Sequence, residues 1–241
     1  MKPTDLLYLH DMGTLSLDAH VVGMETAGGQ SVIILDQTVF YPQGGGQPYD
    51  QGTIESTDGT FRVEEVRFVD GIVRHIGSYT TGGFSDGQTV ACSVDPERRR
   101  LHSRIHSAGH LVDMAVHALA LPWKPGKGYH FPDGPYVEYE GSLDTMVVEQ
   151  LKRHLEETMD RFVKEALPVT VQFLPRDQMV PVCAFVPDNI PTNKPSRVVV
   201  FGTFGVPCGG THVHTLADLG MVSIRKIKQR GATVRVGYDV S

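Results

Sequence analysis

A change of residue pattern near position 95 divides this chain and limits the folds that it can adopt. Before that point, short runs rich in β-branched residues alternate with turn-forming Gly and Asp clusters. These runs are "SVIILDQTVFY" (31–41), "FRVEEVRFVDGIVRHIG" (61–77) and "QTVACSV" (88–94). Short strands with frequent turns and no helical period predict a small β-barrel or a sandwich.

A long helix is predicted from about residue 95. Asp95 is suited to cap its first turn, and Pro96 to occupy the first helical position. Apolar residues then recur at helical spacing, namely Leu101, Ile105, Ala108, Leu111, Val112, Ala115 and Leu119. Pro122 marks the end of this pattern, and a second apolar stripe predicts another helix at about 145–166.

Apolar and β-branched runs around the second helix predict strands. They are "YVEYEG" (136–141), "VTVQFL" (169–174), "RVVVFG" (197–202), "THVHT" (211–215), "MVSIRKIK" (221–228) and "ATVRVGY" (232–238). We therefore expect an α+β fold with helices packed on one face of an antiparallel sheet. The expected domains are a β-barrel-like domain over 1–94 and an α+β domain over 95–241.

Composition sets the broad class of protein. The 241 residues carry a net charge of −6, which argues against a uniformly basic surface but not against local basic patches. Three dispersed cysteines favour a reducing compartment over a disulfide framework. The sequence has no signal-peptide-like segment and no run approaching about 18 apolar residues. We expect a cytoplasmic protein without a membrane partner, its oligomeric state left open.

The stretch "VPCGGTHVHT" (206–215) contains half of a metal-binding motif. Cys208 and His212 flank two glycines that favour a tight turn. In "HSAGH", His106 and His110 are at i and i+4 of the predicted helix, so both imidazoles leave the same face. Three imidazoles and one thiolate form a donor set suited to one Zn²⁺ per chain.

Two neighbouring histidines leave alternatives open. His102 lies one turn before His106, so the helical pair could be shifted by a turn; His214 shares a face with His212 if that segment is extended. A solvated or hydrogen-bonded histidine is the preferred interpretation of both. The helical pair lacks the glutamate of HExxH, which removes the general base of a metalloprotease.

A run of three glycines lies in "FYPQGGGQPYDQG" (40–52). It could form a wide hairpin turn, or leave backbone N–H groups unobstructed and let another chain segment approach closely. It is not a phosphate-binding loop, because the Gly-Lys-Ser/Thr ending is missing.

Two basic segments stand out in this acidic chain. The first carries Arg98, Arg99, Arg100 and Arg104, and the second Arg225, Lys226, Lys228, Arg230 and Arg235. Both neighbour candidate metal ligands in sequence, which favours contact with a polyanion such as nucleic acid. The alternative is a solvated helix turn and strand edge.

These motifs together resemble a known family. "HSAGH", followed about a hundred residues later by "CGGTHV", is similar to the editing domain of alanyl-tRNA synthetases and to the free-standing AlaX-type trans-editing proteins. "VDPERRRLHSRIHSAGHLV", "FYPQGGGQPYDQG" and "KGYHFPDGPYVEYEG" (127–141) resemble the approach to the family's metal-binding helix, its glycine-rich motif and the stretch after that helix. The resemblance covers roughly 1–241 without an aminoacylation module, so the chain looks like the free-standing form with an N-terminal barrel.

The resemblance implies an ATP-independent aminoacyl-tRNA deacylase of translation quality control. Its substrates would be the acceptor ends of Ser-tRNA(Ala) and Gly-tRNA(Ala), hydrolysed in trans with zinc. The implied zinc ligands are His106, His110, Cys208 and His212, of which His106, His110 and Cys208 are also expected to be catalytic. The expected substrate-binding residues are Gly44, Gly45, Gly46, Gln47, Gly109, Lys127, His130 and Thr211.

The chain departs from the family at Gly109. Synthetase editing domains commonly read His-x-Ala-Thr-His, and the Thr hydroxyl helps to recognise serine. Because alanine is smaller than serine, the pocket must require a hydroxyl and cannot protect alanine by size. The contact would have to come from another residue such as Thr211 or His130, which leaves the preference for serine over glycine open.

Two roles for the metal fit this sequence. A zinc ion with four protein ligands is normally structural, and could position the 3′ end while backbone N–H groups hold the oxyanion. Expanded coordination or ligand exchange would instead lower the pKa of a water. A non-catalytic, zinc-stabilised nucleic-acid-binding module is the alternative function, and a zinc hydrolase of small molecules is a third.

Overall fold

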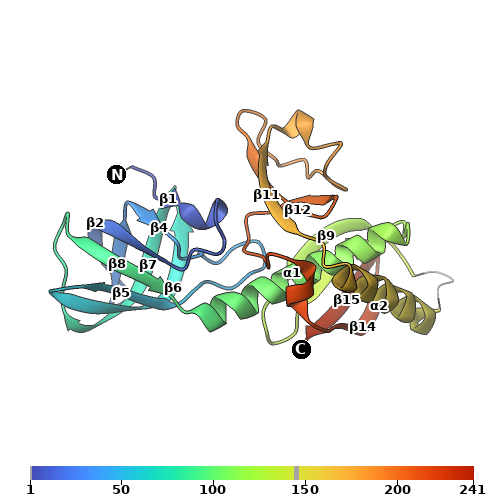
Figure 1. Ribbon diagram of the computed structural model, residues 1–241, viewed down its shortest axis with the longest axis horizontal. Helices are drawn as coiled ribbons and strands as arrows, with labels where there is room; N and C mark the ends of the chain where they lie inside the picture. The colour runs from blue at the N-terminus through green and yellow to red at the C-terminus, as the bar shows by residue number, and fades with distance from the viewer. Residues whose placement is uncertain (1, 144–146) are drawn as a thin grey trace. The chain divides into compact units, whose positions relative to one another are not determined.

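The computed structural model describes residues 2–143 and 147–241, in two compact units (Figure 1). Unit 1 comprises the chain up to Gly44 together with Pro48–Leu101, and unit 2 comprises Gly45–Gln47 together with His102–Ser241. Each unit buries a hydrophobic cluster of its own. The fold is α+β with an N-terminal barrel, as predicted.

Unit 1 is an antiparallel barrel that closes in the order β2-β3-β7-β6-β5-β8. Its strands are β2 (Ser16–Ala27), β3 (Gln30–Leu35), β5 (Gly52–Ser56), β6 (Gly59–Val69), β7 (Ile72–Gly82) and β8 (Thr89–Val94). Along β8, Val90, Cys92 and Val94 are buried and their neighbours exposed, the alternation that a closed sheet requires. The short strands β1 (Asp5–Leu6) and β4 (Gln37–Thr38) pair in parallel, and a 3₁₀ turn (Leu7–Leu9) follows β1.

The strand-rich runs of the sequence correspond to parts of this barrel. The run 61–77 forms the β6-β7 hairpin, which turns at Asp70 and Gly71 with φ of 50° and 84°. The run 31–41 is divided between β3 and β4. The strands β2 and β5 had not been predicted, because their polar and glycine residues weaken the alternation.

A buried ion pair anchors the beginning of α1 (Pro96–Ala118) in unit 1. The predicted cap is present, because Asp95 Oδ1 accepts hydrogen bonds from the N–H groups of Glu97 and Arg98, both at 3.0 Å. Arg99 is only 3% exposed and forms an ion pair with the buried Asp50. Arg99 is therefore committed to the fold and not available to a polyanion.

Unit 2 contains an antiparallel sheet in the order β14-β15-β10-β9. Its strands are β9 (Lys124–Tyr129), β10 (Tyr136–Glu140), β14 (Val222–Arg230) and β15 (Thr233–Val240). Leu111 of α1, Leu155 of α2 (Val148–Lys164) and Val236 of β15 belong to one buried cluster, so both helices pack on the same core. A second sheet has the order β11-β12-β13, formed by Val169–Leu174, Ser196–Phe201 and Phe204–Pro207.

The predicted strand at 211–215 is wrong. This segment is a loop in which Thr211, His212 and Val213 are all buried, so its side chains do not alternate between two faces. The Val213 N–H donates to Ser107 Oγ at 3.1 Å instead of to a neighbouring strand. Two 3₁₀ turns, Arg176–Gln178 and Leu216–Leu219, complete the elements.

The two predicted helices correspond to α1 and α2. The prediction for α2 began at residue 145, and residues 145–146 lie outside the described part of the chain. The strands β9 and β13 had not been predicted, because "KPGKGY" and "FGVP" are short and rich in Gly and Pro. Within residues 2–143 and 147–241, no helix has the length and apolar character needed to cross a membrane.

Candidate metal centre

Four side chains that could hold a metal ion meet in unit 2. His106 and His110 come from α1, Cys208 and His212 come from the loop after β13, and their ligand atoms all lie within 4.8 Å of one another. The Cys208 Sγ is 3.5 Å from His106 Nε2 and 3.3 Å from His212 Nε2. The fold thus joins the two halves of the motif, about a hundred residues apart in sequence.

The outer nitrogen of each imidazole is held by a neighbouring side chain. The pairs are His106 Nδ1 with Gln47 Oε1 at 2.8 Å, His110 Nδ1 with Asp113 Oδ2 at 3.1 Å, and His212 Nδ1 with Ser107 Oγ at 3.1 Å. Amide and carboxylate oxygens only accept hydrogen bonds, so His106 and His110 carry a proton on Nδ1. Their Nε2 atoms face the cluster, an arrangement that metal-ligating histidines commonly adopt.

The charge states of the cluster also suit a cation. Burial, with nearby histidines, holds the pKa values of His106 and His212 well below the ordinary range, so both rings are neutral. Burial alone would raise the pKa of the Cys208 thiol, but its contact with His110 and the charge of Arg197 outweigh burial and lower it. Neutral imidazoles and a thiolate are the forms that bind metal.

His110 shows most directly that the group fits a metal ion. Its Nε2 is buried and has no hydrogen-bond partner among the residues that the structure describes. Burial tends to lower the pKa of His110, yet Asp113 and Cys208 outweigh burial and raise it. A raised pKa means that His110 tends to hold a second proton. A metal cation between His110 Nε2 and Cys208 Sγ would take the place of that proton. It would also satisfy the buried Nε2, whose lack of a partner costs about 1–3 kcal/mol.

The loop that carries Cys208 is held by a buried arginine. Arg197 Nη1 donates to the carbonyl oxygens of Cys208 at 2.6 Å and Gly210 at 2.9 Å. A Cβ at Gly210 would lie 2.2 Å from the His106 ring, so only glycine lets the loop pass this close to α1. The double glycine of the motif is thus explained by close approach at its second member.

A cavity of about 490 Å³ opens beside the cluster. His106, His110 and Cys208 lie in its wall, together with the expected substrate-binding residues Gly45, Gly46, Lys127 and His130. Residues of β9 and β13 complete the wall, and Phe185 and Phe204 contribute apolar side chains to it. Lys127 is exposed, and the His130 side chain is 3% exposed.

The glycine-rich motif approaches β9 closely. The Gly46 carbonyl accepts a hydrogen bond from His130 N–H at 2.8 Å, and a Cβ on Gly46 would lie 2.3 Å from the Gly128 carbonyl oxygen. The φ of Gly46 is +77°, which other residues rarely adopt. Gly44, in contrast, belongs to unit 1, where its carbonyl accepts from the Tyr41 hydroxyl at 2.9 Å.

Gly109 leaves the room that the His130 ring fills. A Cβ on Gly109 would lie 2.4 Å from His130 Cε1 and 3.0 Å from the Tyr238 hydroxyl. That hydroxyl donates to Ile105 O at 3.0 Å, so it accepts from His130 Nδ1 at 2.6 Å. His130 is stacked on His106 with 4.3 Å between ring centroids, and its Nε2 is the nitrogen left to accept a hydrogen bond.

Gln47 and Thr211 are buried and contact each other. Gln47 Nε2 donates to Thr211 Oγ1 at 2.9 Å, and Thr211 N–H donates to Gln47 Oε1 at 3.0 Å. The Thr211 hydroxyl also lies 2.7 Å from Ser103 Oγ. Neither residue is among the described residues that line the cavity, so both act here through the position of the histidines.

The two other candidate ligands, His102 and His214, are not in the metal-binding group. His102 is buried and His214 is exposed. Four residues that hold the site in place had not been predicted: Ser107, Asp113, Arg197 and Tyr238. A charged residue inside an apolar pattern, as in "HLVDMAV" and "SRVVVF", is the signal that could have identified Asp113 and Arg197.

Comparison with known proteins places this chain beside a class of enzymes that act on tRNA. A family model described as "tRNA synthetases class II (A)" matches residues 11–98. The alanine–tRNA ligase of Methanothrix thermoacetophila is 30% identical over 236 residues, which are 95% of this chain and 24% of that protein. The ligase of Methanobrevibacter smithii is 28% identical over 94% of the chain, and that of Cupriavidus necator 28% over 87%.

The resemblance to the alanyl-tRNA synthetase family is therefore confirmed, over nearly the whole chain. The chain spans about a quarter of the length of these relatives.

Proposed function

We propose that this chain hydrolyses the ester bond between a wrong amino acid and tRNA(Ala), in trans, with serine as the first candidate and glycine as the second. Its similarity to alanine–tRNA ligases supports tRNA(Ala) as the partner and a tRNA-related enzymatic activity. The observation that carries the proposal is that His106, His110 and Cys208 belong both to the metal-binding group and to the wall of the cavity. A purely structural metal would not need an adjoining cavity.

The metal that suits this group is Zn²⁺, one ion per chain. Three imidazole nitrogens and one thiolate match its preferred ligands, and the orphaned His110 Nε2 supports an ion at their centre. When bound, zinc would supply a Lewis acid beside the substrate ester. Gln47, Asp113 and Ser107 keep the three imidazoles in the orientation that this requires.

Ester hydrolysis requires a positioned water and support for the charge that develops on the carbonyl oxygen. The glycines that line the cavity let the ester approach the main chain closely. Lys127, exposed at the same wall, is suited to meet a phosphate of the terminal nucleotides. Burial lowers the pKa of His130 to about 3, so its ring stays neutral and polar inside the cavity.

His130 is the residue that we propose to recognise the serine hydroxyl. His130 Nδ1–H donates a hydrogen bond to the Tyr238 hydroxyl, which leaves Nε2 to accept a hydrogen bond from a substrate O–H. Alanine lacks this donor, and an unpaired polar atom in a closed site disfavours its binding. Thr211 is less suited, because Gln47 and Ser103 already occupy its hydroxyl.

The decisive experiment follows ester loss from Ser-tRNA(Ala), Gly-tRNA(Ala) and Ala-tRNA(Ala) with the intact chain and two histidine variants. We expect rapid loss of serine, slow or no loss of alanine, and a fall in kcat/KM of at least about a hundredfold in His212→Ala. His214→Ala is the matched control, because it lies two residues away, is exposed and should keep full activity.

Zinc content measured on the same samples separates the roles of the metal. We expect the zinc of His212→Ala to fall with its activity, while His214→Ala keeps both. Full deacylation without zinc would eliminate a catalytic part for the ion. Binding of tRNA without any ester loss would favour the non-catalytic module instead.

A further inference from the structure

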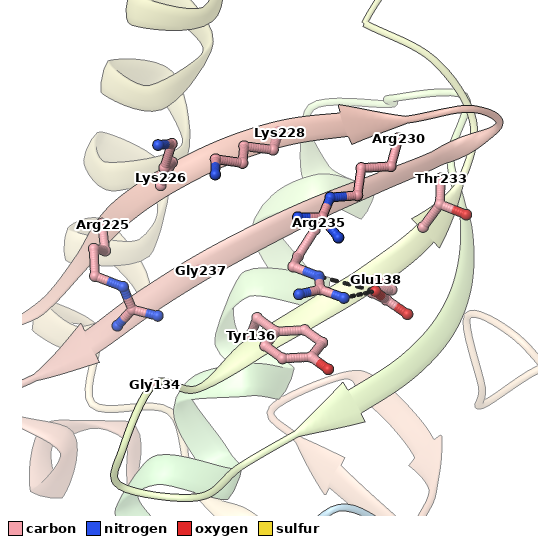
Figure 2. A pocket seen from close by; sticks show the side chains of 10 residues that line it. All are labelled: Gly134, Tyr136, Glu138, Arg225, Lys226, Lys228, Arg230, Thr233, Arg235 and Gly237. Atoms are coloured by element: carbon pink, nitrogen blue, oxygen red, sulfur yellow. Dashed lines mark hydrogen bonds and ion pairs between the residues drawn. The ribbon is translucent and has the colours of Figure 1, made fainter.

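The exposed face of the β14-β15-β10 sheet forms a basic groove that none of the candidate metal ligands lines (Figure 2). Its volume is about 390 Å³, and Gly134 and Gly237 leave part of it free of side chains. The cations that line it are Arg225, Lys226, Lys228 and Arg230 of β14 and Arg235 of β15. Glu138 is the acidic residue among its lining residues.

The strand geometry explains why so many cations share one face. Ile224 and Ile227 are buried on the helix-covered face, and the register shifts between Ile224 and Lys226. Such a bulge adds a residue to one strand, so Arg225 and Lys226 both reach the groove although they are consecutive. Lys228 and Arg230 then continue along the same strand (Figure 2).

Two arginines of the groove, Arg235 and Arg225, are held in place by hydrogen bonds. Arg235 donates to Glu138 Oε1 from Nε at 2.9 Å and from Nη2 at 2.6 Å, and its guanidinium lies 3.9 Å from the Tyr136 ring centroid. Arg225 donates to the carbonyl oxygens of Tyr238 and Pro135, at 2.8 and 3.0 Å, and pairs with Asp239. Both positive charges are thus ordered before a ligand arrives, which reduces the entropy lost on binding.

Three further cations along β14 are not paired with carboxylates in this way. Lys226, Lys228 and Arg230 form no ion pair with an acidic residue of the described chain. The contact with Lys226 and the charges of Arg230 and Arg235 lower the pKa of Lys228. Crowded like charges repel one another, and a ligand that carries a row of negative charges would relieve this repulsion.

Tyr136, which lines the groove, belongs to a stack of half-buried aromatic rings, and this stack favours nucleic acid over other polyanions. Tyr136 stacks on Tyr129 with ring centroids 5.3 Å apart, and Tyr129 stacks on Phe131 at 4.7 Å, each pair at 17° between planes. Phosphates bind to lysine and arginine, whereas exposed aromatic edges and faces contact sugars and unpaired bases. The charged groups of a lipid headgroup or an acidic peptide do not stack on aromatic rings.

The groove adjoins the metal-binding cavity within unit 2. Glu138 lines both the groove and the cavity, and Lys127 lines the cavity. An RNA strand laid along the groove would therefore have a short path for its end to reach the cavity.

We infer that the basic groove of β14, β15 and β10 binds the phosphodiester backbone of the RNA whose aminoacylated end enters the cavity. This inference rests on the proposed function for the identity of the RNA. The groove itself binds backbone and not sequence, because its contacts are charges with no groups arranged to read base edges. It contributes affinity for the RNA and no chemistry.

The test compares two double variants that each remove two positive charges. Lys226→Gln/Lys228→Gln alters the groove, and Lys152→Gln/Arg153→Gln alters α2 as the matched control. Binding of uncharged tRNA(Ala) is measured against salt concentration. We expect the groove variant to bind at least about tenfold more weakly, with a salt slope smaller by about two, and the control to match the unaltered chain.

Kinetics with two substrates separate this inference from the proposed function. On Ser-tRNA(Ala) the groove variant should show a raised KM with an unchanged kcat, and on seryl-adenosine, which lacks the backbone, it should match the unaltered chain. Equal tRNA binding by the two double variants overturns the inference, as does a loss seen only with phosphatidylserine vesicles. If the unaltered chain binds tRNA through the groove but hydrolyses neither ester, the inference stands and the proposed function fails.

Discussion

At the scale of single residues, the site depends on a few positions with little freedom. Gly109 and Gly210 are glycines because the rings of His130 and His106 occupy the space of their side chains. Gln47 is buried and joins the glycine-rich motif to His106 and Thr211. These contacts set where His106 and His130 lie.

Gly109→Ala should destabilise unit 2. Alanine gains about 1 kcal/mol over glycine inside a helix. Its Cβ would lie 2.4 Å from His130, and such overpacking costs about 1–3 kcal/mol in addition to the threatened His130–Tyr238 hydrogen bond. We expect a net loss of about 1–2 kcal/mol in the free energy of unfolding, measured with urea.

Gly209→Ala provides the control, because nothing lies within 4 Å of the position that its Cβ would take. Its free energy of unfolding should change by less than about 0.5 kcal/mol. A Gly109→Ala protein as stable as the Gly209→Ala protein would show that His130 moves aside freely, and would weaken its proposed part in recognising serine.

At the scale of elements, α1 combines two tasks. Its first turn carries Arg99, which binds Asp50 and donates to Val39 O at 2.6 Å, all within unit 1. Two turns later the same helix presents His106 and His110 within unit 2. The predicted helix and its cap are confirmed, and His106 and His110 share one face of it as predicted, whereas the use of Arg99 as a buried anchor could not be seen in a run of arginines.

Arg99→Met should strongly destabilise unit 1. The change leaves the Asp50 carboxylate buried without its cation, and breaking a buried pair in this way costs about 3–5 kcal/mol. Urea unfolding followed by circular dichroism measures the loss. Arg100→Met, at the exposed neighbouring position, should change the free energy of unfolding by less than about 0.5 kcal/mol; similar values for the two variants would refute the anchoring role of Arg99.

At the scale of the whole molecule, each of the two units has its own hydrophobic core. Unit 1 buries His75, whose Nδ1 donates to Ile33 O at 2.9 Å and whose Nε2 lies 2.9 Å from the Thr38 hydroxyl. Burial lowers the pKa of this imidazole from 6.5 to about 4, although the bond to Ile33 opposes the shift. Unit 2 contains Trp123, the single tryptophan of the chain.

Acid should therefore weaken unit 1 through His75. In the unfolded chain His75 is protonated below about pH 6.5, whereas in the folded unit it stays neutral until about pH 4. Its contribution to the free energy of unfolding is therefore complete above about pH 6.5 and is lost as the pH falls toward about 4. The contribution lost by pH 5 is about 2 kcal/mol. His75→Gln should lack this part of the pH dependence.

Two optical signals follow the two units in this experiment. Trp123 fluorescence reports unit 2, and circular dichroism reports both. Between pH 7.5 and pH 5, the unaltered chain should lose more stability than His75→Gln. This difference should appear in circular dichroism and not in fluorescence. An identical pH dependence for the two proteins would contradict the assignment to His75.

The sequence by itself determined the features that depend on the spacing of neighbouring residues. Residues at i and i+4 share a helix face whatever the fold, so the His106–His110 pair, the Asp95 cap and the strand-to-helix change at 95 were all predictable. Only the tertiary structure decided which segments meet. It made 211–215 a loop against α1, seated Gln47 on His106, filled the space over Gly109 with His130, and gathered the cations of β14 and β15 on one open face. These pairings join residues far apart in the chain, and they form only when the elements of each unit pack together, which no local pattern specifies.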